Sequence, residues 1–410
     1  MSDLDTGDTA FVLLSAALVL FMTPGLALFY GGMVRAKNVL NMLLQSFFLI
    51  GLATVIWGVV AYSLAFGPDV GHIIGGLDYV FLNGVGADPN ADLAGTIPHL
   101  AFMIFQAMFA VITPALVTGA IAERTRFTSL MVFFALWLAL IYAPVAHWVW
   151  APGGWLREMG AIDFAGGTVV HILSASTAAA LILVIGPRIG HRESPMAPHS
   201  LPLTVLGAGI LWFGWFGFNA GSALAANGLA ASAFASTHMA AAAATVSWVI
   251  AEALHRGKPT TLGAASGCVA GLVAVTPAAG FVTPGSALVI GLLAGAICYY
   301  AVLLKGRLGY DDALDVLGIH GIGGTLGALL TGVFATTVIN EAGRNGLFRG
   351  NPGQVGIQAV AVLTTIGFGF VGSLALGLIC HKVLGLRSTA DHEIIGLDTT
   401  EHEERAYEMY

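Results

Sequence analysis

In two segments of the sequence, an aspartate and a histidine occur at the same spacing, and both residue types can exchange a proton. His171 lies eight residues after Asp163, and His320 lies eight residues after Asp312. A neutral imidazole has one nitrogen that donates a hydrogen bond and one that accepts, so two rings in contact can share a proton while both stay uncharged. The repeated spacing therefore predicts a functional pair of uncharged histidines.

Each of these aspartates stands just before an apolar run, where a helix is expected to begin. A carboxylate at a helix start accepts hydrogen bonds from free backbone N–H groups and meets the positive end of the helix dipole. We therefore expect Asp163 and Asp312 to cap helices and support the site rather than to relay protons. Because no acidic residue lies in the middle of an apolar run, a carboxylate-driven pump is poorly supported.

The composition indicates that most of the chain is dissolved in lipid. Of its 410 residues, 57% are apolar or aromatic and 10% are charged, whereas a soluble domain carries roughly 25% charged residues. These values exclude a cytosolic enzyme and a disordered chain. The net charge of -7, without a basic patch, also excludes a nucleic-acid partner.

The apolar runs predict an all-α polytopic membrane protein, since a helix needs about 20 apolar residues to cross a hydrocarbon core of roughly 30 Å. The first run is too long for the apolar part of a signal peptide and is expected to remain as a span. Eleven transmembrane helices are predicted, at 9–33, 40–66, 98–121, 128–150, 164–186, 200–219, 234–254, 262–280, 285–304, 313–337 and 355–384.

The positive charges predict an N-terminus outside and a C-terminus inside. With that orientation the outer loops hold three of the 16 Lys and Arg residues, and the inner loops and tail hold the other thirteen. The outer ones are Arg157, Arg344 and Arg349. The inner ones are Arg35, Lys37, Arg124, Arg126, Arg188, Arg192, Arg256, Lys258, Lys305, Arg307, Lys382, Arg387 and Arg405.

The two histidine segments begin spans 5 and 10, which enter the membrane from opposite sides in this arrangement. Spans 1–5 and 6–10 would then form an inverted repeat, an architecture that places its site at the repeat interface near the midplane. Eight helical residues rise about 12 Å, so both histidines would reach the central zone of the membrane. A polar residue at that depth is costly unless it is paired or lines a cavity.

At these residues the sequence resembles the ammonium transporter (Amt/Mep/Rh) family, most closely its bacterial Amt branch. The resemblance covers nearly the whole chain and is carried by segments 29–40, 163–171, 212–222 and 311–324. It implies a homotrimer in the plasma (inner) membrane, with eleven helices and one pore in each subunit.

The resemblance also implies roles for individual residues, with His171 and His320 as the twin histidines of the pore. Phe109 and Phe218 match a stacked aromatic gate. The expected outer recruitment site for the cation comprises Trp150, Phe109 and Ser222, with Asp163 beside it. Supporting positions are expected at Phe105, Gln106, Trp215 and Asp312.

These roles suit the chemistry of ammonium, or of methylammonium as its analogue. An aromatic face attracts a small cation by about 0.5–2 kcal/mol, and a serine hydroxyl can accept one of its N–H bonds. Stripping water from a bare cation is costly, so a path between neutral imidazoles favours ammonia, with the proton possibly moving in a separate step. His147, three residues before Trp150, is expected to be a packing or hydrogen-bonding neighbour.

The sequence divides into an eleven-helix transporter domain, 1–386, and a cytoplasmic regulatory tail, 387–410. Residues 396–407 resemble the family's tail, which implies a P-II signalling protein as a partner. Glu403 stands where the family usually has glycine, which makes a tight turn there doubtful.

Two other functions remain open at this stage. One is an ammonium sensor that signals through its tail, although sensor members usually carry altered pore residues and both histidines are present here. The other is a conduit for carbon dioxide or another small gas, as in Rh relatives. The absence of HExxH and GxSxG motifs argues against an intramembrane enzyme, and we expect neither a metal nor a cofactor.

Overall fold

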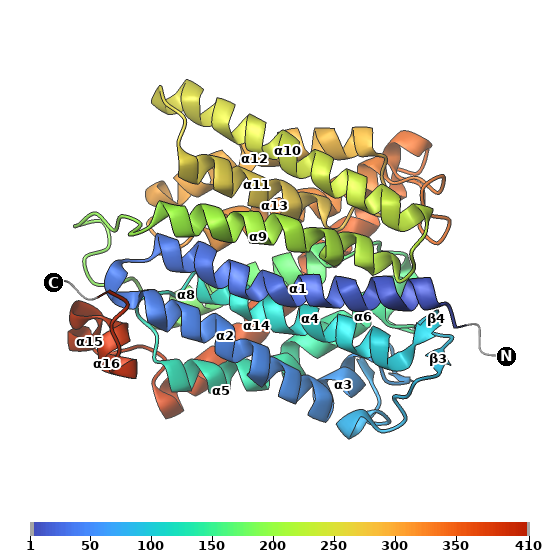
Figure 1. Ribbon diagram of the computed structural model, residues 1–410, viewed down its shortest axis with the longest axis horizontal. Coiled ribbons are helices and arrows are strands. Elements are labelled where there is room, and N and C mark those ends of the chain that lie inside the picture. Colours follow the sequence, from blue (N-terminus) through green and yellow to red (C-terminus); the bar gives the residue numbers. More distant parts are fainter. Residues whose placement is uncertain (1–3, 408–410) are drawn as a thin grey trace.

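The computed structural model describes residues 4–407, which form a bundle of long helices with little β-structure. Most of the helices run roughly along one direction (Figure 1). The first helix begins at one end of the bundle, beside the short strands β3 (Pro89–Asn90) and β4 (Ala94–Pro98). The C-terminal helices α15 (Ala390–Ile395) and α16 (Leu397–His402) lie at the opposite end. We call these the N-terminal and C-terminal ends of the bundle.

Ten helical segments among the described residues are long and apolar enough to cross a membrane. Several comprise more than one element, because π-helical turns, short 3-10 turns or a brief non-helical break divide them. Their bounds are Thr6–Met33 (α1), Ala36–Phe66 (η1, α2, η2 and α3), His99–Thr118 (α4), Phe127–Met159 (α5, η4, α6 and α7), Gly167–Ile185 (η5 and α8), Leu201–Ala223 (α9 and η6), Gly228–Arg256 (α10), Pro284–Leu308 (α12), Leu317–Phe334 (η7 and α13) and Gly353–Leu384 (α14).

The predicted span 262–280 corresponds to α11 (Thr261–Val275), which has 15 residues. At 1.5 Å per residue it reaches about 22 Å, less than the roughly 30 Å of a hydrocarbon core. The helix ends at Val275, and Thr276 still has helical dihedrals (φ -51°, ψ -48°). The ladder of backbone hydrogen bonds stops here because Pro277 has no N–H group to donate. The count of eleven spans therefore stays a prediction.

Small residues let the helices approach closely. Helix α12 lies against α10, and a methyl group added at Gly291 would overlap the backbone carbonyl of Ala240 on α10. Gly295 meets the carbonyl of Ala244 in the same way, one turn further along. In lipid this packing replaces the hydrophobic effect as the main force between helices.

The C-terminal segment is held against the bundle. The carboxylate of Asp398 accepts hydrogen bonds from the backbone N–H groups of Leu40 (3.1 Å) and Asn41 (2.8 Å), and so caps the start of α2 (Val39–Ile56). Lys37 Nζ donates to the carbonyl of Glu393 at 2.7 Å. Glu403 follows α16 with φ 56° and ψ 30°, so the turn that the missing glycine made doubtful is nevertheless formed.

A buried cluster of charges joins the loops at the C-terminal end. Arg188 Nη2 and Asp311 Oδ1 are 2.7 Å apart, and Arg188 Nη1 lies 3.2 Å from Glu123 Oε2. Arg124, which is fully buried, donates to the carbonyl of Asp311 at 2.7 Å. Burial alone would raise the pKa of Asp311, but the hydrogen bonds from Arg188 and the charges of Arg124 and Arg188 hold it well below its usual range.

The division at residue 386 stays a prediction. Residues 1–3 and 408–410, the two extremes of the predicted domains, lie outside the described residues.

Candidate functional site

The two histidines meet inside the bundle. His171 lies in the π-helical turn η5 (Gly167–Ile172), which leads into α8 (Leu173–Ile185), and His320 lies in the π-helical turn η7 (Leu317–Gly321), which leads into α13 (Ile322–Phe334). Their Nδ1 atoms are 3.2 Å apart, and the ring planes differ by 28°. Both side chains are buried, with exposed fractions of 1% and 4%. This geometry allows the rings to share one proton between the two Nδ1 atoms.

The start of η5 is fixed by Asp163. Its Oδ1 accepts hydrogen bonds from the backbone N–H groups of Gly166 (2.9 Å) and Gly167 (2.7 Å), and its Oδ2 accepts from Thr168 N (2.7 Å) and from the Thr168 hydroxyl. Gly167 lies against the ring of Pro277, where a Cβ atom would be only 2.6 Å from the proline Cβ. The expected cap is confirmed, and all four of its hydrogen bonds use the carboxylate.

Asp312 supports η7 in the same way. Its two carboxylate oxygens accept from the backbone N–H groups of Val316 (3.1 Å) and Leu317 (2.7 Å). Burial and the nearby charge of Asp315 raise the pKa of Asp312 to about 6. Both histidines are therefore held in π-helical turns, each with an aspartate cap at its start.

Thr276 is a third polar residue at the pair, and our reasoning from sequence missed it. Its hydroxyl oxygen lies 2.7 Å from the carbonyl of Leu272, 2.9 Å from Nε1 of Trp215 and 3.4 Å from Nε2 of His171. A signal existed in the sequence, because Thr276 and Pro277 are a polar residue and a helix breaker inside the apolar run 262–280.

The contacts of Thr276 assign the protons of both histidines. The hydroxyl has one proton, and it is donated to the Leu272 carbonyl. Nε2 of His171 must therefore carry a proton to make its contact with Thr276, which leaves Nδ1 of His171 as the acceptor. Nδ1 of His320 is then the donor across the 3.2 Å contact, and Nε2 of His320 keeps a free lone pair.

A narrow cavity, which we call the conduit, adjoins the histidines and has a volume of about 10 Å³. That is close to the least space a single water molecule needs. Its walls are mostly apolar, with Met22, Ile112 and Leu211 among them. Trp215 also lines it and stacks on His171, with ring centroids 5.4 Å apart.

Two phenylalanine rings stand at the entrance to this conduit. The rings of Phe109 and Phe218 are 4.5 Å apart, and Phe218 stacks on His171 with centroids 6.0 Å apart. Phe218 lines the narrow conduit, whereas Phe109 lines a much wider cavity on its other side. The contact between the two rings therefore separates the two spaces.

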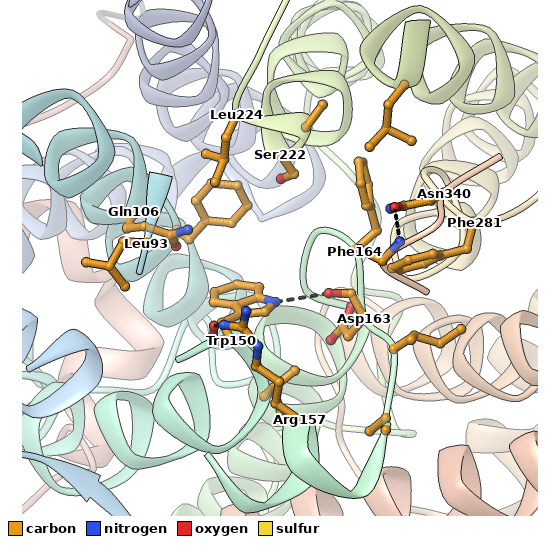
Figure 2. Close-up of a pocket in the computed structure, with 18 of the residues that line it drawn as sticks. Leu93, Gln106, Trp150, Arg157, Asp163, Phe164, Ser222, Leu224, Phe281 and Asn340 are labelled. Atoms are coloured by element: carbon orange, nitrogen blue, oxygen red, sulfur yellow. Dashed lines mark hydrogen bonds between the residues drawn. The ribbon is translucent and has the colours of Figure 1, made fainter. Parts of the chain in front are cut away.

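The wider cavity, which we call the vestibule, has a volume of about 580 Å³. Figure 2 shows Trp150, Asp163, Ser222 and Gln106 around it. The Trp150 ring stands at 80° to that of Phe109, with centroids 5.7 Å apart, and its Nε1 donates to the backbone carbonyl of Asp163 at 3.0 Å. This hydrogen bond fixes the orientation of the indole and leaves its face available.

Two oxygen acceptors line the same space. The Ser222 hydroxyl donates to the Phe218 carbonyl at 2.9 Å, so the lone pairs of its oxygen remain available. Gln106 is 9% exposed, and its Oε1 has no hydrogen-bond partner among residues 4–407. A buried acceptor without a partner is costly, and a ligand with N–H groups would satisfy it.

The structure brings most of the predicted residues to one of these two cavities. Two of them line neither. Phe105 is buried behind Phe109, with ring centroids 5.0 Å apart, and Asp312 lies at the start of η7. His147 makes two hydrogen bonds below Trp150, as expected of a hydrogen-bonding neighbour. Within residues 4–407 there is no group of three or more His, Cys, Asp or Glu residues that could hold a metal ion.

Comparison with known proteins identifies relatives along nearly the whole chain. A family model described as the Ammonium Transporter Family matches residues 10–407. The ammonium transporter of Bacillus subtilis is 51% identical over 403 residues, which is 98% of each chain. Ammonium transporter Amt1 of Archaeoglobus fulgidus is 46% identical over 407 residues, covering 99% of this chain and 100% of that protein.

Solved structures have the same fold. The crystal structure of Saccharomyces cerevisiae Mep2 matches with a TM-score of 0.89 and 36% identity, covering 95% of this chain and 89% of that chain. A structure called Sensor Amt Protein matches with a TM-score of 0.88 and 32% identity, covering 97% of this chain and 98% of that chain.

Proposed function

The chain belongs to the ammonium transporter family, and we propose that it takes up ammonium at the vestibule and passes ammonia along the conduit beside His171 and His320. The observation that carries this proposal is the contact of two buried imidazoles, 3.2 Å apart, beside a narrow apolar conduit. The relatives are named transporters, which points to transport rather than catalysis.

Recruitment of ammonium is the first step. The faces of Trp150 and Phe109 attract a cation by about 0.5–2 kcal/mol. The oxygens of Ser222 and Gln106 can each accept one of its N–H bonds. The carboxylate of Asp163 contributes its negative charge at a distance and holds η5, because its hydrogen bonds to the backbone and to Thr168 occupy both of its oxygens.

Loss of a proton is the second step, and selectivity follows from it. The rings of Phe109 and Phe218 close the passage, and a bare cation cannot cross such an apolar constriction without a large desolvation cost. Ammonium avoids this cost by transferring its proton to solvent water in the vestibule and crossing as ammonia. Potassium has no proton to leave, so the same constriction stops it.

Passage beside the histidines is the third step. The His171–His320 pair is connected by one shared proton, and Nε2 of His320 presents a lone pair. An ammonia molecule can donate a hydrogen bond to this nitrogen while neither ring becomes charged. The pair thus replaces part of the hydration of ammonia without offering a site for a cation.

The wider assembly that we propose follows the family. The proposal comprises eleven spans in a plasma (inner) membrane, an inverted repeat of spans 1–5 and 6–10, the N-terminus outside and the C-terminus inside. The Asp-capped π-helical turns in both halves support the repeat. The first helix begins at one end of the bundle and the tail helices lie at the other, which supports termini on opposite sides of the membrane.

We also propose a homotrimer with a P-II signalling protein at the C-terminal end. His238 supports an assembly, because this polar side chain is exposed on the membrane-spanning helix α10, in its N-terminal half. Such a residue in lipid is costly, and a protein neighbour would remove that cost. The docked helices α15 and α16 offer the partner a surface at the C-terminal end.

A sensor is a second candidate, favoured by the likeness to the Sensor Amt Protein. In that case ligand binding would be reported through the tail while little nitrogen crosses. Reconstituted protein without flux, but with partner binding that depends on ammonium, would favour the sensor.

Uptake of methylammonium in cells that lack their own ammonium carriers tests the proposal. We expect the wild type to take it up and the His171→Ala/His320→Ala double variant to lose transport or its selectivity. His255→Ala is a matched control, because His255 bonds Tyr299 and lines neither the vestibule nor the conduit. A double variant with unaltered transport and selectivity would remove the mechanism.

A further inference from the structure

His147 faces two hydrogen-bond acceptors from inside the bundle. It lies on α6 (Ala143–Trp150) and is 0% exposed. Its Nδ1 is 2.9 Å from the backbone carbonyl of Ala65, and its Nε2 is 2.9 Å from Oδ1 of Asp69. A carbonyl and an ionised carboxylate can only accept, whereas a neutral imidazole has one N–H to donate. Both contacts are therefore satisfied together only when the pair holds one additional proton.

The surroundings place that proton on the imidazole. The hydrogen bond from His147 holds the pKa of Asp69 below its usual range, so the carboxyl is ionised. Ala65 lies in the last turn of α3 (Tyr62–Phe66), where unpaired carbonyls make a negative helix end. A cation in this position is stabilised by the helix end and by the carboxylate at once.

The same carboxylate belongs to a hairpin that touches the turn after Trp150. The hairpin consists of β1 (Asp69–Val70) and β2 (Ile74–Gly75). Trp148 Nε1 donates to the carbonyl of Ile73 at 2.7 Å, and Nδ1 of His72 lies 2.6 Å from the carbonyl of Gly153. The hairpin therefore holds both sides of the segment that presents the Trp150 indole to the vestibule.

We propose that His147 and Asp69 are positioning residues, and that their protonated pair fixes the hairpin against α6 and thereby sets the place of Trp150. Loss of the proton removes one of the two hydrogen bonds of His147 and leaves an imidazole lone pair facing a carboxylate or a carbonyl. The hairpin then loosens and Trp150 loses its support. The effect on uptake rests on the proposed function, whereas the protonation of the pair and the hold on the hairpin do not.

Apart from His72, which also contacts Asp69, the titratable groups on the elements around α6 have partners other than His147 and Asp69. His72 is the nearest, because its Nδ1 lies 3.4 Å from Oδ2 of Asp69 and its charge would strengthen the carboxylate's hold. Glu158 lines the vestibule. Tyr62 contacts His99, and Tyr142 packs against Trp57 and Trp137. Arg157 donates to the Trp150 carbonyl, and His171 contacts His320.

The variant Asp69→Asn removes the negative charge of this side chain and keeps its shape. An asparagine amide can donate to Nε2 of a neutral His147 while Nδ1–H still donates to Ala65, so both hydrogen bonds persist without the additional proton. Hydrogen exchange of the hairpin amides in the purified full-length protein is then compared between about pH 7 and about pH 9. Opening of the wild-type hairpin should increase several-fold between these pH values, beyond the intrinsic change seen in Asp69→Asn. His255→Gln should behave as the wild type does.

A spectroscopic measurement keeps the test decisive if Asp69→Asn fails to fold. Nitrogen NMR of histidine-labelled wild type, with the His147 signals assigned from His147→Gln, should show protons on both ring nitrogens at about pH 7. A His147 ring with a single proton at that pH would overturn the proposal, as would equal pH dependence of the hairpin in wild type and Asp69→Asn.

Uptake provides the functional readout. The ratio of uptake at about pH 9 to uptake at about pH 7 should be several-fold lower in the wild type than in Asp69→Asn, which experiences the same change in substrate protonation. Equal ratios would exclude the effect on Trp150. If neither protein transports at any pH while the NMR and exchange results hold, the proposed function fails and the protonated pair stands.

Discussion

The hydroxyl oxygen of Thr276 lies 3.4 Å from Nε2 of His171, and its proton is already donated to the carbonyl of Leu272. Thr276 therefore determines which nitrogen of His171 carries hydrogen, and through the shared proton it also orients His320. A residue outside the histidine pair thus determines which of the two rings donates the hydrogen bond between them and which accepts it.

Replacing Thr276 with valine, which has nearly the same shape, should remove this control. His171 would then lose its acceptor and could exchange its ring proton between the two nitrogens. Valine also leaves Nε1 of Trp215 without its acceptor. The lost hydrogen bond to His171, about 0.5–1.5 kcal/mol by itself, predicts a reduction in transport of at least about 2- to 10-fold. Methylammonium uptake measures the effect, and Thr276→Ser, which keeps the hydroxyl, should retain most of the activity. Equal loss in both variants would contradict the tautomer assignment.

Asp163 and Asp312 should differ when each is changed to asparagine. Asp163 accepts four hydrogen bonds with its carboxylate, whereas Asp312 accepts two. Because an asparagine has one acceptor oxygen, Asp163→Asn should destabilise the protein by about 2–4 kcal/mol, and Asp312→Asn by about 1 kcal/mol or less. Thermal unfolding of the purified proteins would compare them. A larger loss for Asp312→Asn would contradict this account of the caps.

The pH dependence of stability should change in Asp312→Asn. The pKa of Asp312 is raised from 3.8 to about 6 in the folded protein, so the protonated form is favoured there. This contribution to stability is fully present below about pH 4 and is lost as the pH rises through about 6, a change of up to about 3 kcal/mol. Melting temperatures across this range should fall more in the wild type than in Asp312→Asn. Parallel curves would contradict the buried position of this carboxyl.

Asp311→Asn should weaken the C-terminal end of the bundle. The substitution removes the carboxylate that pairs with Arg188 and leaves the buried Arg124 without a nearby negative charge from this side chain. Removing one partner of a buried ion pair costs about 3–5 kcal/mol. The melting temperature should fall clearly, and faster proteolysis of the loops near Arg188 would locate the change. Lys258→Gln, at an exposed loop position, should have no comparable effect.

Glu403→Gly should stabilise the docked tail. Glu403 adopts a left-handed conformation with φ 56°, which costs a residue with a Cβ atom about 1–2 kcal/mol. Glycine avoids most of this cost, although it also loses more chain entropy on folding. Hydrogen exchange of α15 and α16 should become slower in the variant. Faster exchange would show that the Glu403 side chain contributes more than its backbone conformation costs.

The sequence predicted the elements that depend on local pattern. The spacing of Asp163 to His171 and of Asp312 to His320 predicted two capped helix starts that bring imidazoles together, and the structure contains both. This was possible because a cap and a helical rise are local properties of a few residues.

Features that depend on packing between distant segments could not be predicted in the same way. The hydrogen bonds of Thr276 join α11 to η5 and to α9 (Leu201–Ala220), so its importance is invisible until these elements are assembled. Asp69 and His147 are likewise 78 residues apart in the chain. The short α11 differed from the predicted span because Pro277 ends the helix within an apolar run.

The central claim is that ammonia passes the histidine pair while bare cations do not. Nitrogen flux and electric current should be measured together in liposomes that contain the purified protein, first with an ammonium gradient and then with a potassium gradient. We predict nitrogen flux with ammonium and no current above background with potassium. A potassium current comparable to the nitrogen flux would contradict the account.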